Sequence, residues 1–187
     1  MRKIFMVFTF LIFIPFVSFA QSVHSPYTGE EKREIKALSS EDIEGYLKGH
    51  GMGFAKTAEL NHYPGPNHVL DFAKELALSK KQLDRTKETY DEMHKDAVSS
   101  GRQIVERERI LDNSFANQEI DEKGLMEMTV EIGRLKGELR AVHQKAHLKM
   151  REILSSHQAD KYDELRGCQR NGGKHKHQHH KYHSDHH

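Results

Sequence analysis

The sequence predicts an all-α protein built around a long antiparallel helical hairpin with short helices before it. Two long stretches carry apolar side chains at steps of three, four or seven residues, which is the spacing of one helix face. The pattern Leu-Ser-x-x-Gln occurs at residues 78–82 and again at 154–158. In this pattern the Ser hydroxyl caps a helix, and the Gln three residues later reaches back to the capping residue's N–H. Two long helices with one short connection must lie antiparallel.

Residues 1–20 have the features of a signal peptide. A basic start is followed by an apolar run over residues 4–19, with small side chains at Ser18 and Ala20. A retained membrane anchor is the alternative, but the run contains Pro15 and is short for a spanning helix. We therefore expect cleavage after Ala20 and export of the mature chain.

The charge balance of the mature chain argues against nucleic acid as a partner. Loss of the first twenty residues removes two basic side chains and leaves 27 Lys and Arg against 28 Asp and Glu. Nucleic-acid binding usually needs a basic face, and here the two signs are interspersed. The single cysteine, Cys168, cannot form an internal disulfide, so a free thiol and a link to another chain both stay open.

The predicted helical domain spans residues 39–167 and follows an arm at 21–38. The arm is polar and lacks periodicity, so we expect it to be flexible. Ser39 or Ser40 caps a short helix that ends at the glycines of residues 49–53. Further short helices are expected at 54–60 and 68–76, separated by a Pro-Gly-Pro turn.

The hairpin itself is predicted from residue 79 to residue 153. Its first helix runs to about residue 118, with a bend expected at residues 99–101, and the turn falls at 117–123. The first apolar stripe consists of Leu83, Thr86, Tyr90, Met93, Ala97, Ile104, Leu111 and Phe115, and the second of Leu125, Met128, Ile132, Leu135, Leu139, Val142, Ala146 and Ile153. A hairpin cannot bury both stripes alone, so either the short helices or a second copy of the chain must cover them.

Residues 47–166 resemble the Spy/CpxP family of periplasmic proteins, including its relatives that are periplasmic heavy-metal sensor or resistance proteins. The resemblance is carried by the two Leu-Ser-x-x-Gln copies, by Gly-His-Gly-Met-Gly at 49–53 and by Tyr-Pro-Gly-Pro-Asn-His at 63–68. Ser replaces the Thr of the family's Leu-Thr-x-x-Gln motif and keeps the capping hydroxyl. The resemblance implies an antiparallel, cradle-like homodimer that holds unfolded clients on its concave face. It also implies a membrane sensor or regulator as a partner.

The predicted function is that of an ATP-independent periplasmic chaperone or envelope-stress protein. The sequence contains no Gly-x-Ser-x-Gly elbow, no phosphate loop and no His-Glu-x-x-His helix, so we expect no enzymatic activity and no required cofactor. The alternative is a periplasmic heavy-metal sensor or resistance protein, in which the helical domain is a scaffold for a metal-binding tail.

The predicted metal ligands lie in a low-complexity tail at residues 168–187, which we expect to be disordered. Its histidines are His175, His177, His179, His180, His183, His186 and His187. Clustered neutral imidazoles bind zinc, nickel or copper without a preformed site. An expression tag and adventitious binding are the alternatives.

Two further pairs are weaker candidates for metal binding. His143 and His147 are spaced i, i+4 beside the second stripe, so they either bind one ion on the helix surface or are simply solvated. His50 and Met52 offer a nitrogen and a thioether suited to copper, and an ordinary loop is the alternative.

Overall fold

The computed structural model describes residues 25–167 and divides them into two units. Residues 25–32 form turns and the 3-10 helix η1 (Glu30–Lys32). The second unit, from Arg33 onward, contains the helices α1 (Ser40–Leu47), α2 (Lys56–Glu59), α3 (Pro66–Asp71), α4 (Lys80–Ala116), α5 (Glu122–Ile153) and α6 (Ser156–Leu165). No strand occurs in the described range, and no helix within it is long and apolar enough to cross a membrane. The signal peptide predicted at 1–20 and the tail at 168–187 lie outside the described residues.

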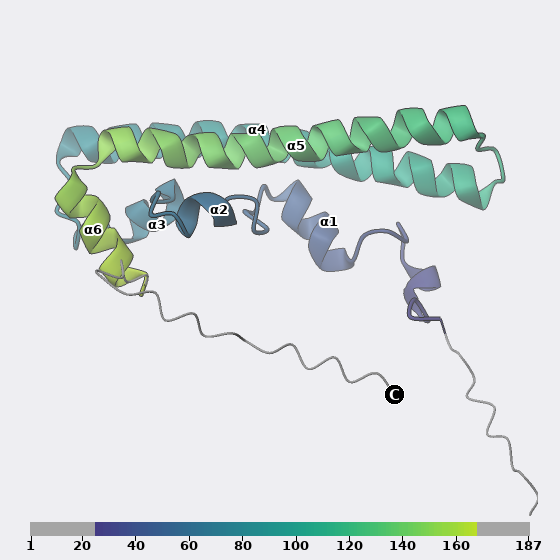
Figure 1. Cartoon of the computed structure of the whole chain (residues 1–187), viewed down its shortest axis with the longest axis horizontal. Coiled ribbons are helices and arrows are strands. Elements are labelled where there is room, and N and C mark those ends of the chain that lie inside the picture. The colour runs from purple at the N-terminus through teal and green to yellow at the C-terminus, as the bar shows by residue number, and fades with distance from the viewer. Residues whose placement is uncertain (1–24, 168–187) are drawn as a thin grey trace, which may run out of the picture. The chain divides into compact units, whose positions relative to one another are not determined.

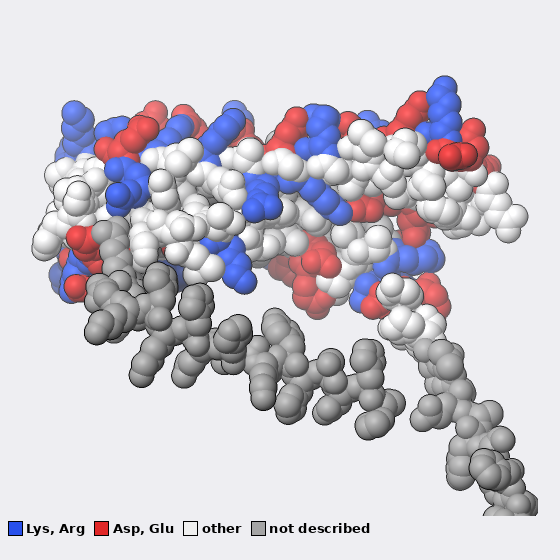
Figure 2. All heavy atoms as spheres, viewed as in Figure 1, with Lys and Arg blue, Asp and Glu red and all other residues white. Residues whose placement is uncertain are grey.

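The second unit is organised around α4 and α5, which lie side by side while the shorter helices follow one side of them (Figure 1). α4 contains 37 residues and α5 contains 32. At 1.5 Å per residue α4 is about 55 Å long. Figure 2 shows Lys and Arg interspersed with Asp and Glu along the edge of this α4–α5 pair that faces away from the short helices. The prediction of an all-α fold with two long packed helices is confirmed.

The two Leu-Ser-x-x-Gln copies begin α4 and α6. Ser79 and Ser155 each accept a hydrogen bond from the backbone N–H three residues on, and both capping boxes are complete. The two glutamines also meet, since Gln82 Nε2 donates to Gln158 Oε1 at 2.8 Å. Each donates in addition to a backbone carbonyl near the other's helix, Gln82 to Ile153 and Gln158 to Leu76. The two motifs therefore form one joint between the starts of α4 and α6.

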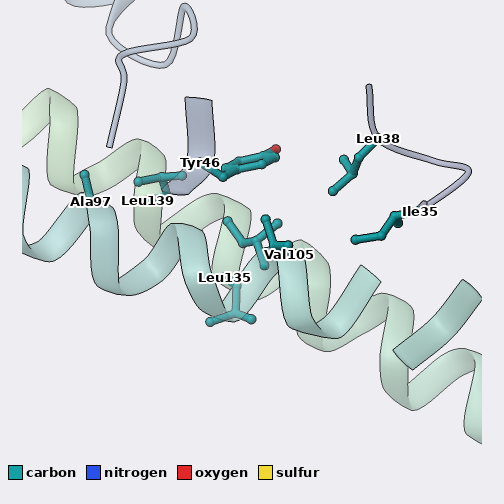
Figure 3. Close-up of a cluster of buried hydrophobic side chains, with 8 residues drawn as sticks. Ile35, Leu38, Tyr46, Ala97, Val105, Leu135 and Leu139 are labelled. Carbon is teal, nitrogen blue, oxygen red and sulfur yellow. The ribbon is translucent and has the colours of Figure 1, made fainter. Parts of the chain in front are cut away.

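The larger core cluster joins the N-terminal segment to the α4–α5 pair (Figure 3). Its members are Ile35, Leu38, Tyr46, Ala97, Ile104, Val105, Leu135 and Leu139. Ile35 is fully buried and Leu38 is 5% exposed, so the prediction of a flexible arm over 21–38 is wrong for its last six residues. Burial of these two apolar side chains anchors the segment, and Lys36 adds a polar contact with α4, since its N–H and its Nζ both donate to Asp112. The short helices thus cover much of the apolar stripe within one chain.

Gly101 permits α1 to approach α4 closely. A Cβ at this position would lie 2.7 Å from the carbonyl carbon of Tyr46 and closer still to its oxygen. α4 continues through residues 99–101 without interruption, so the glycine marks a close contact between helices, where the sequence had suggested a bend.

A smaller core cluster holds α6 and α3 against the end of α5. It consists of Val69, Leu76, Met150, Ile153, Leu154 and Tyr162. The Gly65 N–H donates to the Tyr162 hydroxyl at 3.2 Å, which ties the Pro-Gly-Pro turn to α6. At the opposite end of the α4–α5 pair, the prediction that Phe115 belongs to the buried stripe of α4 is wrong, because its side chain is 54% exposed.

Candidate functional site

Histidines converge on a hollow of about 770 Å³ between the α4–α5 pair and residues 47–68. Five of the seven histidines in the described residues line it, together with two thioethers: His50, His68, His94, His143, His147, Met52 and Met93. We call this hollow the histidine pocket. Its lining includes one carboxylate, that of Glu59.

The histidine pocket is built by α4 and α5 on one side and by residues 47–68, including parts of α2 and α3, on the other. α4 supplies Met93 and His94, and α5 supplies His143 and His147 one turn apart. The segment at 49–53 closes the pocket because Gly49 has φ +63° and lies against α4, where a Cβ would be 3.0 Å from Val98 Cγ2. Glycine adopts this left-handed conformation without the steric cost of a side chain. The glycine at residue 49 therefore lets the chain turn so that His50 and Met52 line the pocket opposite α4 and α5.

His147 is held by one nitrogen and leaves the other free. Its Nδ1 lies 2.8 Å from the Tyr63 carbonyl oxygen, and the ring is 5% exposed. Because a carbonyl only accepts, Nδ1 carries the proton, and Nε2 of the neutral ring keeps its lone pair. Nε2 faces Gly65, where a Cβ would come within 3.2 Å of it. Burial lowers the pKa of His147, while the Tyr63 bond and Glu59 oppose the shift.

His143 is 3% exposed, and its Nε2 has no hydrogen-bond partner in the described part of the chain. The ring stacks on Phe54 with centroids 5.9 Å apart. Burial lowers the pKa of His143 to about 4, and the neighbouring His147 adds to the shift. His143 is therefore neutral at physiological pH and presents an unsatisfied polar atom beside the pocket.

His94 repeats the arrangement of His147 on the opposite wall. Its Nε2 lies 3.0 Å from the Lys48 carbonyl oxygen, and its ring stacks on Tyr90 at 5.7 Å between centroids. By the same argument Nε2 donates, and Nδ1 of the neutral ring is the free nitrogen. Two backbone carbonyls thus orient two pocket imidazoles.

The interpretation of His143 and His147 as solvated residues is wrong, because both rings are buried and neither lies on the helix surface. That the two rings bind one ion stays a prediction. The segment from Phe54 to Gly65 packs over this face of α5 and buries both rings. The apolar stripe correctly indicated the centre of the buried face of α5. It did not reveal that residues 54–65 pack beside the stripe and so extend the buried face to His143 and His147. His50 and Met52, predicted as a separate pair, line the same pocket.

The seven tail histidines and Cys168 lie outside the described residues. Within residues 25–167, no three His, Cys, Asp or Glu side chains are already gathered so as to hold a metal ion. Any ion in the histidine pocket would therefore use fewer of these ligands or add a thioether.

A second hollow of about 550 Å³ lies on the other side of the same segment, between residues 52–60 and α5. Three large apolar side chains are exposed around the two hollows: Leu47 at 41%, Met52 at 38% and Leu60 at 62%. We call these three residues the apolar ridge. The basic residues Lys48, Lys56, Lys136 and Arg140 line the same hollows. Lys48 is paired with Glu44 and Lys136 with Glu108, so the charges around the apolar ridge are of both signs.

Comparison of the chain with models of protein families, with curated proteins and with solved structures finds no match. The resemblance to the Spy/CpxP family therefore stays a prediction.

Acidification should destabilise this region, because two neutral imidazoles are buried there. Both pKa values are lowered in the folded state, so the unfolded chain binds more protons below about pH 6.5. The contribution of these two histidines to the free energy of unfolding is then fully present above that pH and is lost as pH falls towards about 4. For His143 alone the loss is on the order of 3 kcal/mol. Urea denaturation at pH 7.5, 5.5 and 4.5 measures it.

The variant His143→Phe separates this effect from general acid denaturation. Phenylalanine can keep the stacking on Phe54 and removes the titrating group. Its stability should fall less between pH 7.5 and 4.5 than that of the native chain. Equal losses in the two proteins would contradict the assignment of a buried, neutral His143.

Proposed function

We propose that this protein is an exported, ATP-independent chaperone or envelope-stress protein of the Spy/CpxP type that binds unfolded clients. The observation that carries the proposal is the apolar ridge, whose side chains stand exposed beside two hollows. Large apolar side chains exposed beside hollows in a polar surface are typical of protein-binding sites. Export to the periplasm is part of the same proposal and depends on the predicted signal peptide.

The proposed mechanism is weak, reversible capture without nucleotide. Apolar segments of an unfolded client would bury surface against Leu47, Met52 and Leu60. The mixed charges around the hollows would attract charged client segments at longer range. Because each contact is small, the client could leave and refold.

The purified mature chain should suppress the aggregation of an unfolding client at a near-stoichiometric ratio, measured by light scattering. Replacing Leu47 and Leu60 together by serine should abolish most of this protection, since both side chains are exposed and little native packing is lost. Phe115→Ser is the matched control. Phe115 is also exposed, but it lies at the C-terminal end of α4 and lines neither hollow. Absence of protection at every salt concentration would reject the proposal.

We further propose that two copies pair through the outer face of α5, as an antiparallel homodimer of helical hairpins. Opposite its buried face, α5 carries Met126, Val130, Gly133, Gly137 and Leu148 at helical spacing. Met126, Val130 and Leu148 are between 54% and 62% exposed. Nothing lies within 4 Å of a Cβ placed on Gly133 or Gly137, so a partner helix could approach closely there.

The charge distribution along α5 favours antiparallel pairing. Residues 122–133 contain three glutamates and one lysine, whereas residues 134–153 contain six Lys and Arg and two Glu. In an antiparallel pair the acidic half of each α5 would meet the basic half of the other. A parallel pair would place like charges together.

The dimer should dissociate when Val130 and Leu148 are both replaced by aspartate. The two side chains are exposed in the single chain, so its helical content should stay unchanged. Analytical ultracentrifugation should give the monomer mass for this variant and the dimer mass for the native protein. Leu60→Asp, equally exposed but on another segment, should remain dimeric. A native protein that sediments as a monomer would disprove the dimer.

The tail at 168–187 would add binding of zinc, nickel or copper to this function. The rival proposal, a periplasmic heavy-metal sensor or resistance protein, gains support from the histidine pocket, since five imidazoles line it. In that case a membrane sensor or regulator would be the partner. Nucleic acid remains outside both proposals.

A further inference from the structure

The histidine pocket contains nitrogen atoms that no group in the described residues occupies. The Tyr63 carbonyl orients His147 and leaves its Nε2 free, while the Lys48 carbonyl orients His94 and leaves its Nδ1 free. In metal sites a ligating histidine commonly donates its other N–H to such an acceptor, which fixes the tautomer. His143 adds a third nitrogen, which is buried and without a partner.

The unpartnered Nε2 of His143 is the strongest sign of a ligand. Buried polar atoms nearly always have a hydrogen-bond partner, and leaving one unsatisfied costs stability. His143 is 3% exposed and its ring lines the pocket, but Nε2 itself has no contact with solvent, so a bound group would satisfy this atom after a rotation of the ring. His147, one turn further along α5, lines the same pocket.

The lining of the pocket selects a soft ion. Thioethers suit copper(I), and imidazole suits zinc, copper and nickel, whereas carboxylates suit the harder ions magnesium and calcium. The pocket offers the thioethers of Met52 and Met93 and a single carboxylate. Structural zinc almost always takes four ligands, and no group of even three conventional ligands is gathered in residues 25–167. Copper(I) accepts two or three ligands, including thioethers.

We propose that the histidine pocket binds one copper(I) ion through His143, His147 and a methionine thioether from Met52 or Met93. Met52 is 38% exposed on the glycine-rich segment, which gives the ion a route from solvent. This site is distinct from the tail histidines. It shares Met52 with the apolar ridge, but its test measures copper(I) binding and not client protection, so either proposal can fail without the other.

The test uses the full mature chain with the seven tail histidines replaced by asparagine, which removes the competing tail. The probe is copper(I), kept reduced by ascorbate without oxygen and titrated in competition with a coloured copper(I) chelator. We expect one bound equivalent, and X-ray absorption at the copper edge should show both nitrogen and sulfur ligands. Absence of stoichiometric binding, or a shell without sulfur, would overturn the proposal.

Matched variants locate the site in the same full-length background. His143→Phe, and the double change Met52→Leu with Met93→Leu, should each weaken copper(I) binding at least about tenfold. Phenylalanine and leucine keep much of the original shape, and circular dichroism verifies that each variant is folded. His157→Asn is the control, because His157 is exposed on α6 and lies outside the pocket. Unchanged affinity in the folded pocket variants, or an equal loss in the control, would overturn the assignment.

Discussion

Replacing Gly101 by alanine should detach α1 from the α4–α5 pair. The added methyl would occupy the space of the Tyr46 carbonyl group, and a backbone carbonyl cannot rotate away as a side chain can. Relief therefore requires that α1 move, which would loosen the packing of Ile35, Leu38 and Tyr46. We expect a loss of about 3 kcal/mol, at the upper end for overpacked cores. Urea denaturation and limited proteolysis of the N-terminal segment measure the two effects.

Gly133→Ala is the control for this change. Gly133 also lies within a long helix, but no atom lies within 4 Å of its added Cβ. Because alanine favours helix over glycine, this variant should be as stable as the native chain or more stable by up to about 1 kcal/mol. If both alanine variants are equally stable, the close approach of α1 to α4 is wrong.

Replacing Leu139 by aspartate should unfold the protein. Leu139 is 2% exposed in the larger core cluster, where it packs among apolar side chains. An unpaired carboxylate there costs several kcal/mol, about as much as the whole stability of a small domain. Far-ultraviolet circular dichroism at neutral pH should show a large loss of helix.

Leu148→Asp places the same charge on the same helix at a position that is 54% exposed. A chain carrying this single change should keep its helical signal, and its only expected effect is on the pairing of two copies. Retention of full helicity by Leu139→Asp would show that the buried face of α5 is assigned incorrectly.

The starts of α4 and α6 could be predicted from local sequence, but the contact between them could not. Ser79 and Ser155 could be assigned as caps because a capping box involves only four consecutive residues. The bond between Gln82 and Gln158 joins side chains 76 residues apart, and no local pattern encodes that distance. The second copy begins a helix as its pattern predicts, but the pattern does not show that this helix is the separate α6 or that it packs beside the start of α4.

The candidate site was less predictable than the fold. The spacing of His143 and His147 is readable in the sequence, yet their burial depends on Phe54 and Tyr63 packing over α5. Ile35 and Leu38 were missed for a related reason, since two apolar residues in a polar segment create no periodic signal. Tertiary contacts made by short, irregular segments decide both features.

The glutamine joint makes the beginning of α4 depend on a part of the chain that is synthesised much later. Until residue 158 is present, Gln82 can complete its capping box but not its contacts with Gln158 and the Ile153 carbonyl. The corresponding bond from Gln158 to the Leu76 carbonyl must wait as well. Closing a loop of this length carries an entropic cost before the contact forms, so this joint should be among the late steps of folding. A chain that crosses a membrane with its N-terminus first would therefore keep the start of α4 open to exchange until α6 emerges.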